Sequence, residues 1–214
     1  MFTVLDLACG TGSYLATQRK LFEPRGIRWC GVDSSREALE VARGRLSGVE
    51  LAHGQAEAIP FPDATFGYVN TSFAFHRFND QLATLDEIGR VLAPRGALRL
   101  YNLAPAFMKE WWLYDFFPEA RLIDEERYWA PRRLHEALAA RRFTSSIRVE
   151  YELGNVRLAE LVEQVEQRSL SNLTLLRDAD YERGKERLLE AFDNEPDGTL
   201  PAELALLTCT AVRG

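Results

Sequence analysis

The fold of this 214-residue chain is decided by one stretch near its start, Val4-Leu5-Asp6-Leu7-Ala8-Cys9-Gly10-Thr11-Gly12-Ser13. A short apolar run ends in two closely spaced glycines and gives way to helix-forming residues, which predicts a strand, a tight turn and the start of a helix. Such a turn lies at the carboxyl edge of a parallel α/β sheet, where ligands bind, and its glycines let backbone N–H groups approach a ligand closely. The position indicates a nucleotide site, although a glycine pair also closes ordinary strand-to-helix turns.

Composition limits the class of protein and of partner. The length suits one α/β domain with an elaboration. Acidic residues outnumber basic ones, 32 against 26, so the net charge of −6 argues against a broad grip on nucleic acid and favours a small-molecule substrate. The three cysteines lie in apolar, strand-like runs without Cys-x-x-Cys or Cys/His clustering, so we expect buried thiols and no metal site.

The sequence has no pattern typical of targeting or membrane insertion. It lacks the basic segment and apolar segment of a signal peptide, and no apolar run approaches the roughly 20 residues that span a bilayer. We therefore expect a cytoplasmic protein with no membrane partner.

Strand-like and helix-like segments alternate along most of the chain. Apolar runs predict strands from the chain start to residue 7 and over 27–33, 49–52, 66–71, 97–103, 147–153 and 204–212. This alternation implies right-handed crossovers and a doubly wound, mostly parallel, Rossmann-like sheet. The closing segment, with two helices between the last strands, allows an antiparallel last strand at an edge.

Helical periodicity predicts the elements between the strands. Helices are expected over 13–21, after Asp33, from residue 79 or 80 to 94–96, from about 131, and over 158–167 and 181–192. The first should stop before Pro24 and Gly26, which break helices for different reasons. Ser34 and Glu37 have the spacing of a capping box for the second.

One domain is expected over 1–214. Within it, 1–103 would form a cofactor-binding half, and 104–143 and 154–200 would form cap elements on the substrate side. Aromatic residues crowd between Phe107 and Trp129. These rings have two interpretations, as a wall for an apolar or aromatic substrate and as a small core that holds the cap to the sheet.

Asp33 lies about twenty residues beyond the glycines, at the tip of the second predicted strand. A carboxylate there can accept both hydroxyl protons of a ribose; the alternative is an acid that favours the dipole of the following helix. In the dinucleotide fingerprint G-x-G-x-x-G the third glycine lets the helix pack close to the strand, whereas this chain has Leu15. A pyrophosphate-binding turn is therefore disfavoured.

Several segments, in order, resemble the motifs of class I S-adenosylmethionine-dependent methyltransferases of the type 11-like kind. The matching segments are Leu5-Asp6-Leu7-Ala8-Cys9-Gly10-Thr11-Gly12, Gly31-Val32-Asp33-Ser34-Ser35, Gln55-Ala56-Glu57-Ala58-Ile59-Pro60-Phe61, Phe66-Gly67-Tyr68-Val69-Asn70-Thr71-Ser72-Phe73 and Glu87-Ile88-Gly89-Arg90-Val91-Leu92-Ala93-Pro94-Arg95-Gly96-Ala97. The resemblance spans 3–103, about half of the chain, and motifs in the right order are more specific than any one alone.

The resemblance implies S-adenosylmethionine as cofactor and ten residues around it. Asp6, Gly10, Thr11 and Gly12 would surround the methionine portion, Asp33 the ribose, Ser34, Gln55 and Ala56 the adenine, and Asn70 and Ser72 the sulfonium side. The family often has an acid where this chain has Gln55. A carboxamide oxygen can still accept a proton from the adenine amino group, with weaker binding because the charge-assisted bond is lost.

The implied reaction is in-line methyl transfer to a small organic molecule, which requires alignment and exclusion of water more than acid–base groups. His76, just beyond the fourth predicted strand, is a candidate general base because imidazole titrates near neutrality. The alternative is a histidine hydrogen-bonded in a loop wall.

Two further functions stay open. One is a binding protein that keeps the cofactor fold without turnover, as a ligand sensor or partner subunit. The other is a nicotinamide-dependent oxidoreductase, which rests only on Gly10, Gly12 and Asp33. Relatives often carry a helix before the first strand that covers the cofactor, whereas here the strand begins almost at Met1. A second copy of the chain, in a homodimer, could supply that cover.

Overall fold

A computed structural model of the chain describes residues 1–22 and 26–214. The chain divides into two compact units. Unit 1 contains Met1–Asn102, Pro131–Arg148 and Leu207–Gly214, and unit 2 contains Leu103–Ala130 and Val149–Leu206. The expected roles of 104–143 and 154–200 as substrate-side elements stay predictions.

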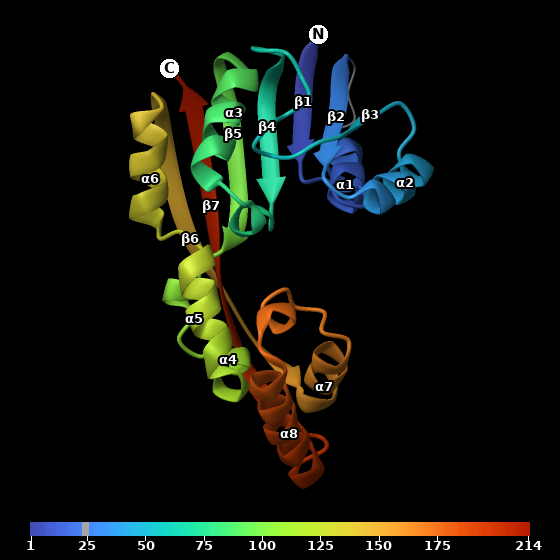
Figure 1. The fold of residues 1–214 in the computed structure, drawn as a ribbon, viewed down its shortest axis with the longest axis vertical. Coiled ribbons are helices and arrows are strands. Elements are labelled where there is room, and N and C mark those ends of the chain that lie inside the picture. The colour runs from blue at the N-terminus through green and yellow to red at the C-terminus, as the bar shows by residue number, and fades with distance from the viewer. Residues whose placement is uncertain (23–25) are drawn as a thin grey trace. The chain divides into compact units, whose positions relative to one another are not determined.

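A seven-stranded sheet has the order β3-β2-β1-β4-β5-β7-β6. Its strands are β1 (Phe2–Leu7), β2 (Ile27–Asp33), β3 (Glu50–His53), β4 (Phe66–Ser72), β5 (Leu92–Leu103), β6 (Phe143–Arg157) and β7 (Thr199–Arg213). The first five are parallel, and β5, β7 and β6 are antiparallel to one another in turn. The predicted fold class is therefore confirmed. In Figure 1 the N- and C-termini lie at the same end of the sheet.

The position of the last strand differs from the expectation. β7 lies between β5 and β6, so β6 is the edge strand. Within unit 1, β7 carries the buried residues Leu207, Cys209 and Ala211, whereas exposed and partly buried residues alternate along β6 after the buried Phe143. The strand with the more apolar row takes the inner position because there it loses contact with water on both sides.

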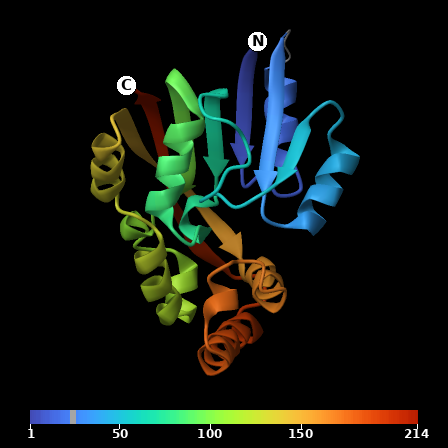
Figure 2. The same cartoon turned by 45° about the horizontal axis from the view of Figure 1, so that its top comes forward.

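Helices cover both faces of the sheet in unit 1. α1 (Ser13–Leu21) and α2 (Arg36–Arg45) lie on one face, and α3 (Gln81–Val91) and α6 (Pro131–Ala140) lie on the other (Figures 1 and 2). The predicted bounds of α1 are confirmed, while Pro24, expected to help end it, lies outside the described residues.

Leu15 packs α1 onto the sheet. It is fully buried in a cluster with Val4, Trp29, Ala42 and Leu46. A side chain thus fills the helix–strand interface that the third glycine of a dinucleotide fingerprint would leave open. Gly12 precedes α1 with φ of 75°, and an added Cβ would lie 2.6 Å from Cδ1 of Leu46. The second glycine of the turn is therefore required by backbone conformation and by packing.

Two local predictions were wrong by a few residues. Ser35, not Ser34, caps α2: its Oγ accepts from the N–H of Ala38 at 3.0 Å, and Glu37 bonds the Ser35 hydroxyl. Asp33 causes the shift because its Oδ1 accepts the Ser35 N–H at 2.9 Å. β5 begins at Leu92 instead of 97, because residues 93–96 form an irregularity in the pairing with β4, with φ of 62° at Arg95.

Unit 2 is mainly helical. It contains the 3-10 turn η2 (Pro105–Phe107), α4 (Trp112–Phe116), α5 (Pro118–Arg127), α7 (Leu158–Glu166), η3 (Leu173–Leu175) and α8 (Asp178–Asn194). Trp111, Trp112, Phe117 and Trp129 are buried, which favours the core interpretation for these rings, whereas Phe107 is 39% exposed. α7 ends one residue before the predicted end of 158–167, and α8 extends beyond the predicted 181–192 at both ends. β6 and β7 are longer than the strands predicted over 147–153 and 204–212.

A buried carboxyl group connects three segments of unit 2. Oδ2 of Asp124 accepts hydrogen bonds from the hydroxyl of Tyr114 at 3.1 Å and from Nδ2 of Asn172 at 2.7 Å. Burial raises the pKa of Asp124, although these two hydrogen bonds oppose the rise. The network fixes α5 against α4 and the segment before η3.

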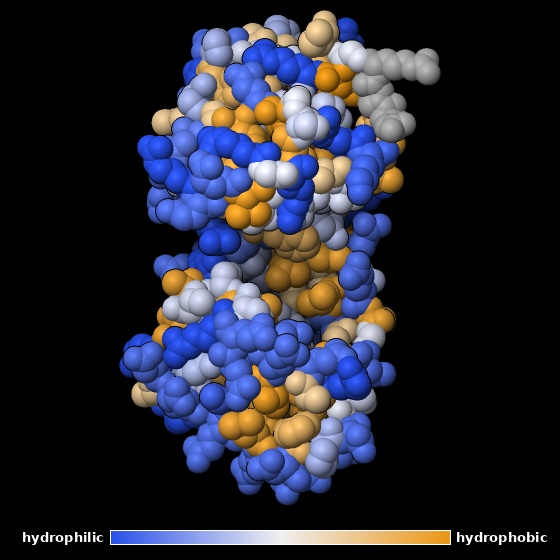
Figure 3. Space-filling model, turned by 90° about the vertical axis from the view of Figure 1, so that its right-hand side faces the viewer, coloured by the Kyte–Doolittle hydropathy of each residue, from blue (hydrophilic) through white to orange (hydrophobic). Residues whose placement is uncertain are grey.

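The face shown in Figure 3 is largely hydrophilic, with smaller hydrophobic areas between the hydrophilic residues. Among the described residues, no helix is long and apolar enough to cross a membrane.

Candidate functional site

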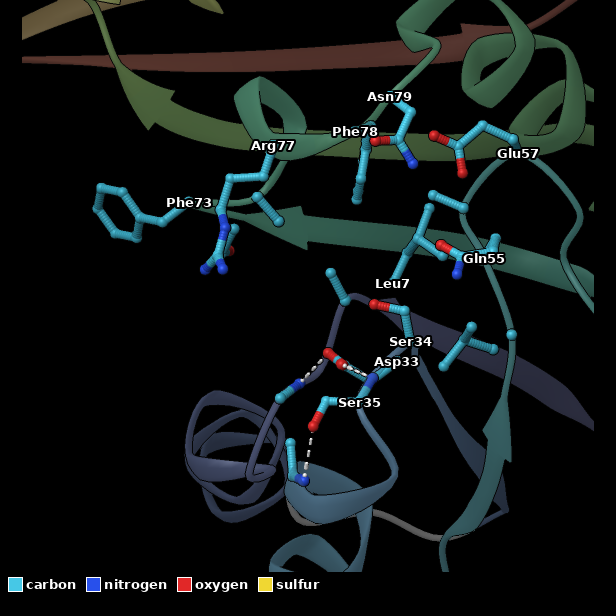
Figure 4. A pocket seen from close by; sticks show the side chains of 18 residues that line it. Leu7, Asp33, Ser34, Ser35, Gln55, Glu57, Phe73, Arg77, Phe78 and Asn79 are labelled. Atoms are coloured by element: carbon cyan, nitrogen blue, oxygen red, sulfur yellow. Dashed lines mark hydrogen bonds between the residues drawn. The ribbon is translucent and has the colours of Figure 1, made fainter. Parts of the chain in front are cut away.

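A cavity of about 610 Å³ opens at the carboxyl edge of the sheet in unit 1 (Figure 4). Its volume falls in the range of roughly 300–1,000 Å³ that small-molecule sites occupy. The carboxyl ends of β1, β2 and β4, the segments that follow β1, β2, β3 and β4, and the first turn of α2 supply its walls. They contribute Leu7, Ala8, Gly10, Val32, Asp33, Ser34, Ser35, Ala38, Gly54, Gln55, Ala56, Glu57, Ser72, Phe73, Ala74, Arg77, Phe78 and Asn79.

Six of the ten predicted cofactor-binding residues line this cavity. They lie at the ends of β2 and β4 or in the segments after β1, β2 and β3, and are Gly10, Asp33, Ser34, Gln55, Ala56 and Ser72. The parallel strands bring them together because their carboxyl ends meet at one edge of the sheet. The other four do not line it: Asp6, Thr11, Gly12 and Asn70.

Asp33 links the turn after β1 to the start of α2. Its Oδ2 accepts the N–H of Gly10 at 2.7 Å and its Oδ1 accepts the N–H of Ser35 at 2.9 Å (Figure 4). Each carboxylate oxygen has a second lone pair, so the group can hold the backbone and still accept from a ligand. The structure thus adds a structural role that the sequence did not predict.

Asp6 and Asn70 are buried and do not line the cavity. They face each other across β1 and β4, and Nδ2 of Asn70 donates to Oδ1 of Asp6 at 2.8 Å. Arg99 donates to Oδ1 of Asn70 at 3.3 Å and to the hydroxyl of Tyr14 at 2.9 Å. Asp6 and Asn70 are both buried, and their predicted contact with the cofactor stays a prediction.

Burial raises the pKa of Asp6 from 3.8 to about 7; the hydrogen bond from Asn70 opposes the rise, and the charge of Asp33 adds to it. Because the folded-state pKa is raised, the stability that Asp6 contributes is complete below pH 4 and is lost as the pH rises through about 7. We expect Asp6→Asn to remove this loss, which amounts to about 1.4 kcal/mol for each unit of pKa difference.

Urea unfolding of wild type and Asp6→Asn at pH 5, 6, 7 and 8 measures the effect. The stability of the variant relative to wild type should grow with pH. Glu40→Gln, at an exposed position of α2, is the matched control and should show no such trend. A constant difference between Asp6→Asn and wild type across the series would refute the assignment.

The predicted adenine loop is held by α3. The guanidinium of Arg90 donates to the carbonyl oxygens of Ile59 and Phe61, each at 2.9 Å, and to Oδ1 of Asp63 at 2.8 Å. Glu87 accepts from Arg90 and from the N–H of Ile59, at 2.8 Å. Gln55 pairs with Ala58 in an isolated bridge, so the loop that presents Gln55 is ordered at both ends.

Two residues of the cavity have backbone conformations that side chains rarely adopt. Ala8 has φ of 60° directly after β1, and Phe73 has φ of 51° directly after β4. Such strain concentrates at ligand sites, where the surrounding structure imposes it. Both residues line the cavity, which supports a ligand-binding role for this edge of the sheet.

The remaining predicted residues lie outside the cavity lining. His76 belongs to the 3-10 turn η1 (Phe75–Arg77), is buried, and its Nδ1 lies 3.2 Å from Oδ1 of Asn102. This geometry matches the alternative of a hydrogen-bonded histidine in a loop wall, and the base role stays a prediction. Thr11 is exposed, and Arg45 bonds its carbonyl oxygen and hydroxyl.

Sequence reasoning missed the far wall of the cavity. Phe73, Arg77, Phe78 and Asn79 all line it, and Glu57 lies near Asn79 in Figure 4. The available signal was position: these residues directly follow β4, and loops at the carboxyl edge of a parallel sheet form ligand sites.

The fold and the cavity together define a Rossmann-like α/β protein with a cavity of small-molecule size at the carboxyl edge of its sheet. Residues 4–96 match the family described as "Methyltransferase domain". The resemblance inferred from the sequence is confirmed over these residues, which match a methyltransferase domain. The matched residues make up less than half of the chain.

A demethylmenaquinone methyltransferase of Staphylococcus aureus is 34% identical over 120 residues, which cover 53% of this chain and 49% of that protein. The chain thus spans about half the length of the curated relatives it matches. Two solved structures share the fold. A putative methyltransferase from an antibiotic biosynthesis pathway of Anabaena variabilis has a TM-score of 0.70 and 21% identity, covering 97% of this chain and 90% of that one. A putative methyltransferase of Bacillus halodurans has a TM-score of 0.66 and 19% identity, covering 99% and 92%.

Proposed function

We propose that the chain binds S-adenosylmethionine in this cavity and transfers its methyl group to a small organic molecule. One observation carries the proposal: Gln55 with Ala56, Asp33 and Gly10, expected to contact the adenine, the ribose and the methionine portion, line a single cavity. Membership of the methyltransferase domain family supports the same cofactor.

The donors and acceptors of the cavity fit this cofactor. Asp33 keeps lone pairs for the ribose hydroxyls, and Ala56 is buried beside Gln55, whose amide can pair with an adenine edge. Asp33 and Glu57 also place carboxylates in a cavity that would receive a positively charged sulfonium. We therefore assign Gln55, Ala56, Asp33 and Gly10 to the cofactor.

Bound S-adenosylmethionine supplies an activated methyl group, which needs alignment with the acceptor more than acid–base catalysis. In our proposal the loops after β1 and β4 perform this alignment, because Ala8 and Phe73 are held in fixed left-handed conformations there. Phe73 is 47% exposed and packs edge-on against Tyr101 at 5.0 Å, so its ring can exclude water on the acceptor side.

Gln55→Asp is expected to tighten cofactor binding about fivefold, or about 1 kcal/mol, because a carboxylate accepts the adenine amino proton more strongly than a carboxamide. Calorimetric titration with S-adenosylhomocysteine measures it. Gln55→Ala is the matched control and should weaken binding. Equal or weaker binding by Gln55→Asp would contradict the placement of the adenine.

A thermal-shift panel tests the cofactor itself. S-adenosylmethionine or S-adenosylhomocysteine at a hundredfold excess over its dissociation constant should add about 2.7 kcal/mol of stability, and nicotinamide dinucleotides should add none. Stabilisation by the dinucleotides alone would favour the oxidoreductase. Cofactor binding without transfer to any acceptor in a metabolite screen would favour the sensor or partner subunit.

The acceptor is proposed only as a small organic molecule. The curated relative is named a demethylmenaquinone methyltransferase, and that name describes the relative and not this chain. A general base at His76 requires its imidazole to reach the acceptor, so His76→Ala with wild-type turnover at every pH would remove that role. The cytoplasmic location and a homodimer that covers the pocket also belong to this proposal, and light scattering of the cofactor-bound chain tests the dimer.

A further inference from the structure

Arg77 is the exposed end of a rigid turn at the cavity. Its N–H donates to the carbonyl oxygen of Ala74 at 2.7 Å, and the preceding Phe75 and His76 are buried. Nε2 of Gln81 also donates to the carbonyl oxygen of Phe75, at 2.8 Å. The backbone that carries Arg77 is therefore fixed, while its guanidinium lines the cavity.

The charged groups of the cavity differ in whether they have hydrogen-bond partners within the protein. Asp33 accepts two backbone N–H groups, and Glu57 accepts the N–H of Asp80 at 3.1 Å. Arg77 is the cation among the lining residues, and within the described chain no hydrogen bond or ion pair is found for its guanidinium. An arginine presented in this way is available to an anionic group of a ligand.

The cavity residues lie in a definite order. Figure 4 shows Gln55 and Glu57 on one side, Phe73 and Arg77 on the opposite side, and Asp33 between the two groups. If adenine lies at Gln55 and ribose at Asp33, the chain that continues from the ribose extends toward Arg77. This order rests on the proposed function.

We propose that Arg77 binds the carboxylate of the amino-acid portion of the cofactor. A planar guanidinium can make two parallel hydrogen bonds to a carboxylate, and this pairing is stronger than one between neutral groups. Phe73 lines the same side of the cavity. The carboxylate of an acidic acceptor has the same chemistry, so the experiment must separate the two sources.

The experiment compares two ligands by calorimetry: S-adenosylhomocysteine and its decarboxylated analogue, S-adenosyl-3-thiopropylamine. Arg77→Gln should weaken the binding of S-adenosylhomocysteine about 10- to 100-fold. Its affinity for the decarboxylated analogue should stay within about twofold of that of wild type. Arg77→Lys keeps the positive charge but loses the paired N–H donors of the guanidinium. Its affinity for S-adenosylhomocysteine should therefore lie between those of Arg77→Gln and wild type. Unchanged melting temperatures of the free variants confirm that they fold.

Arg36→Gln is the matched control. It removes the same charge from an exposed position of α2 outside the cavity lining, and should bind both ligands as wild type does. The proposal would be overturned if Arg77→Gln lost affinity equally for both ligands, or lost affinity for neither. Benzoate binding to the S-adenosylhomocysteine-loaded protein that depends on Arg77, with unchanged nucleoside affinity, would assign the arginine to an acidic acceptor and also overturn it. Wild type that binds neither nucleoside would instead refute the proposed function.

Discussion

Asp33→Asn is expected to weaken binding of S-adenosylhomocysteine about 100-fold. A charged acceptor contributes about 1.5–3 kcal/mol for each hydrogen bond it makes, and the ribose offers two hydroxyl groups. The substitution also disturbs the protein, because Oδ2 and Oδ1 accept the N–H groups of Gly10 and Ser35. An asparagine presents an NH2 group to one of these donors, so the turn after β1 or the cap of α2 loses its partner.

Calorimetry and urea unfolding separate the two effects. The free variant should lose about 1–3 kcal/mol of unfolding free energy, the cost of leaving a donor unsatisfied, and should remain folded at 20 °C. Glu40→Gln removes a carboxylate from α2 without touching the cavity lining and should change neither quantity. Affinity within threefold of wild type would show that Asp33 holds only the backbone.

The sequence predicts this part of the molecule well for a physical reason. Alternating apolar runs and glycine pairs report local backbone preferences, and the parallel sheet they imply gathers strand ends at one edge. The bounds of α1 agree with prediction at both ends, and Gly10 and Asp33 line one cavity although they are 23 positions apart.

The errors come from contacts that local pattern does not contain. Ser34 and Ser35 are both good capping residues, and the choice between them was made by a hydrogen bond from the Ser35 N–H to Asp33. The family resemblance assigns Asp6 and Asn70 to the cofactor; the structure adds a cross-strand hydrogen bond between them that the sequence did not predict, and their contact with the cofactor stays a prediction. Arg77 has no pattern around it, and its role follows only from the cavity that it lines.

Arg90→Ala is expected to cause the largest loss of stability, about 2–4 kcal/mol, because it removes one side chain that bonds three points of the adenine loop. Ile59 and Phe61 are buried, so their carbonyl oxygens lose partners that water replaces poorly. Glu87 raises the pKa of Arg90 further, and loss of the guanidinium leaves the Glu87 carboxylate without its closest partner. The side chain of Arg90 is 31% exposed, which places the effect below that of a fully buried ion pair.

Arg43→Ala is the matched control, because Arg43 pairs only with the exposed Glu40 within the described residues and should cost less than about 0.5 kcal/mol. Hydrogen exchange provides the readout specific to the loop: the N–H of Ile59, which donates to Glu87, should lose protection in Arg90→Ala before the core of the sheet does. Arg90→Lys keeps the charge but not the fork that reaches two carbonyl oxygens, so it should recover only part of the stability. If Arg90→Ala is no less stable than Arg43→Ala, or if the loop stays protected, then Gln55 is held in the cavity by the loop itself and α3 has no part in positioning it.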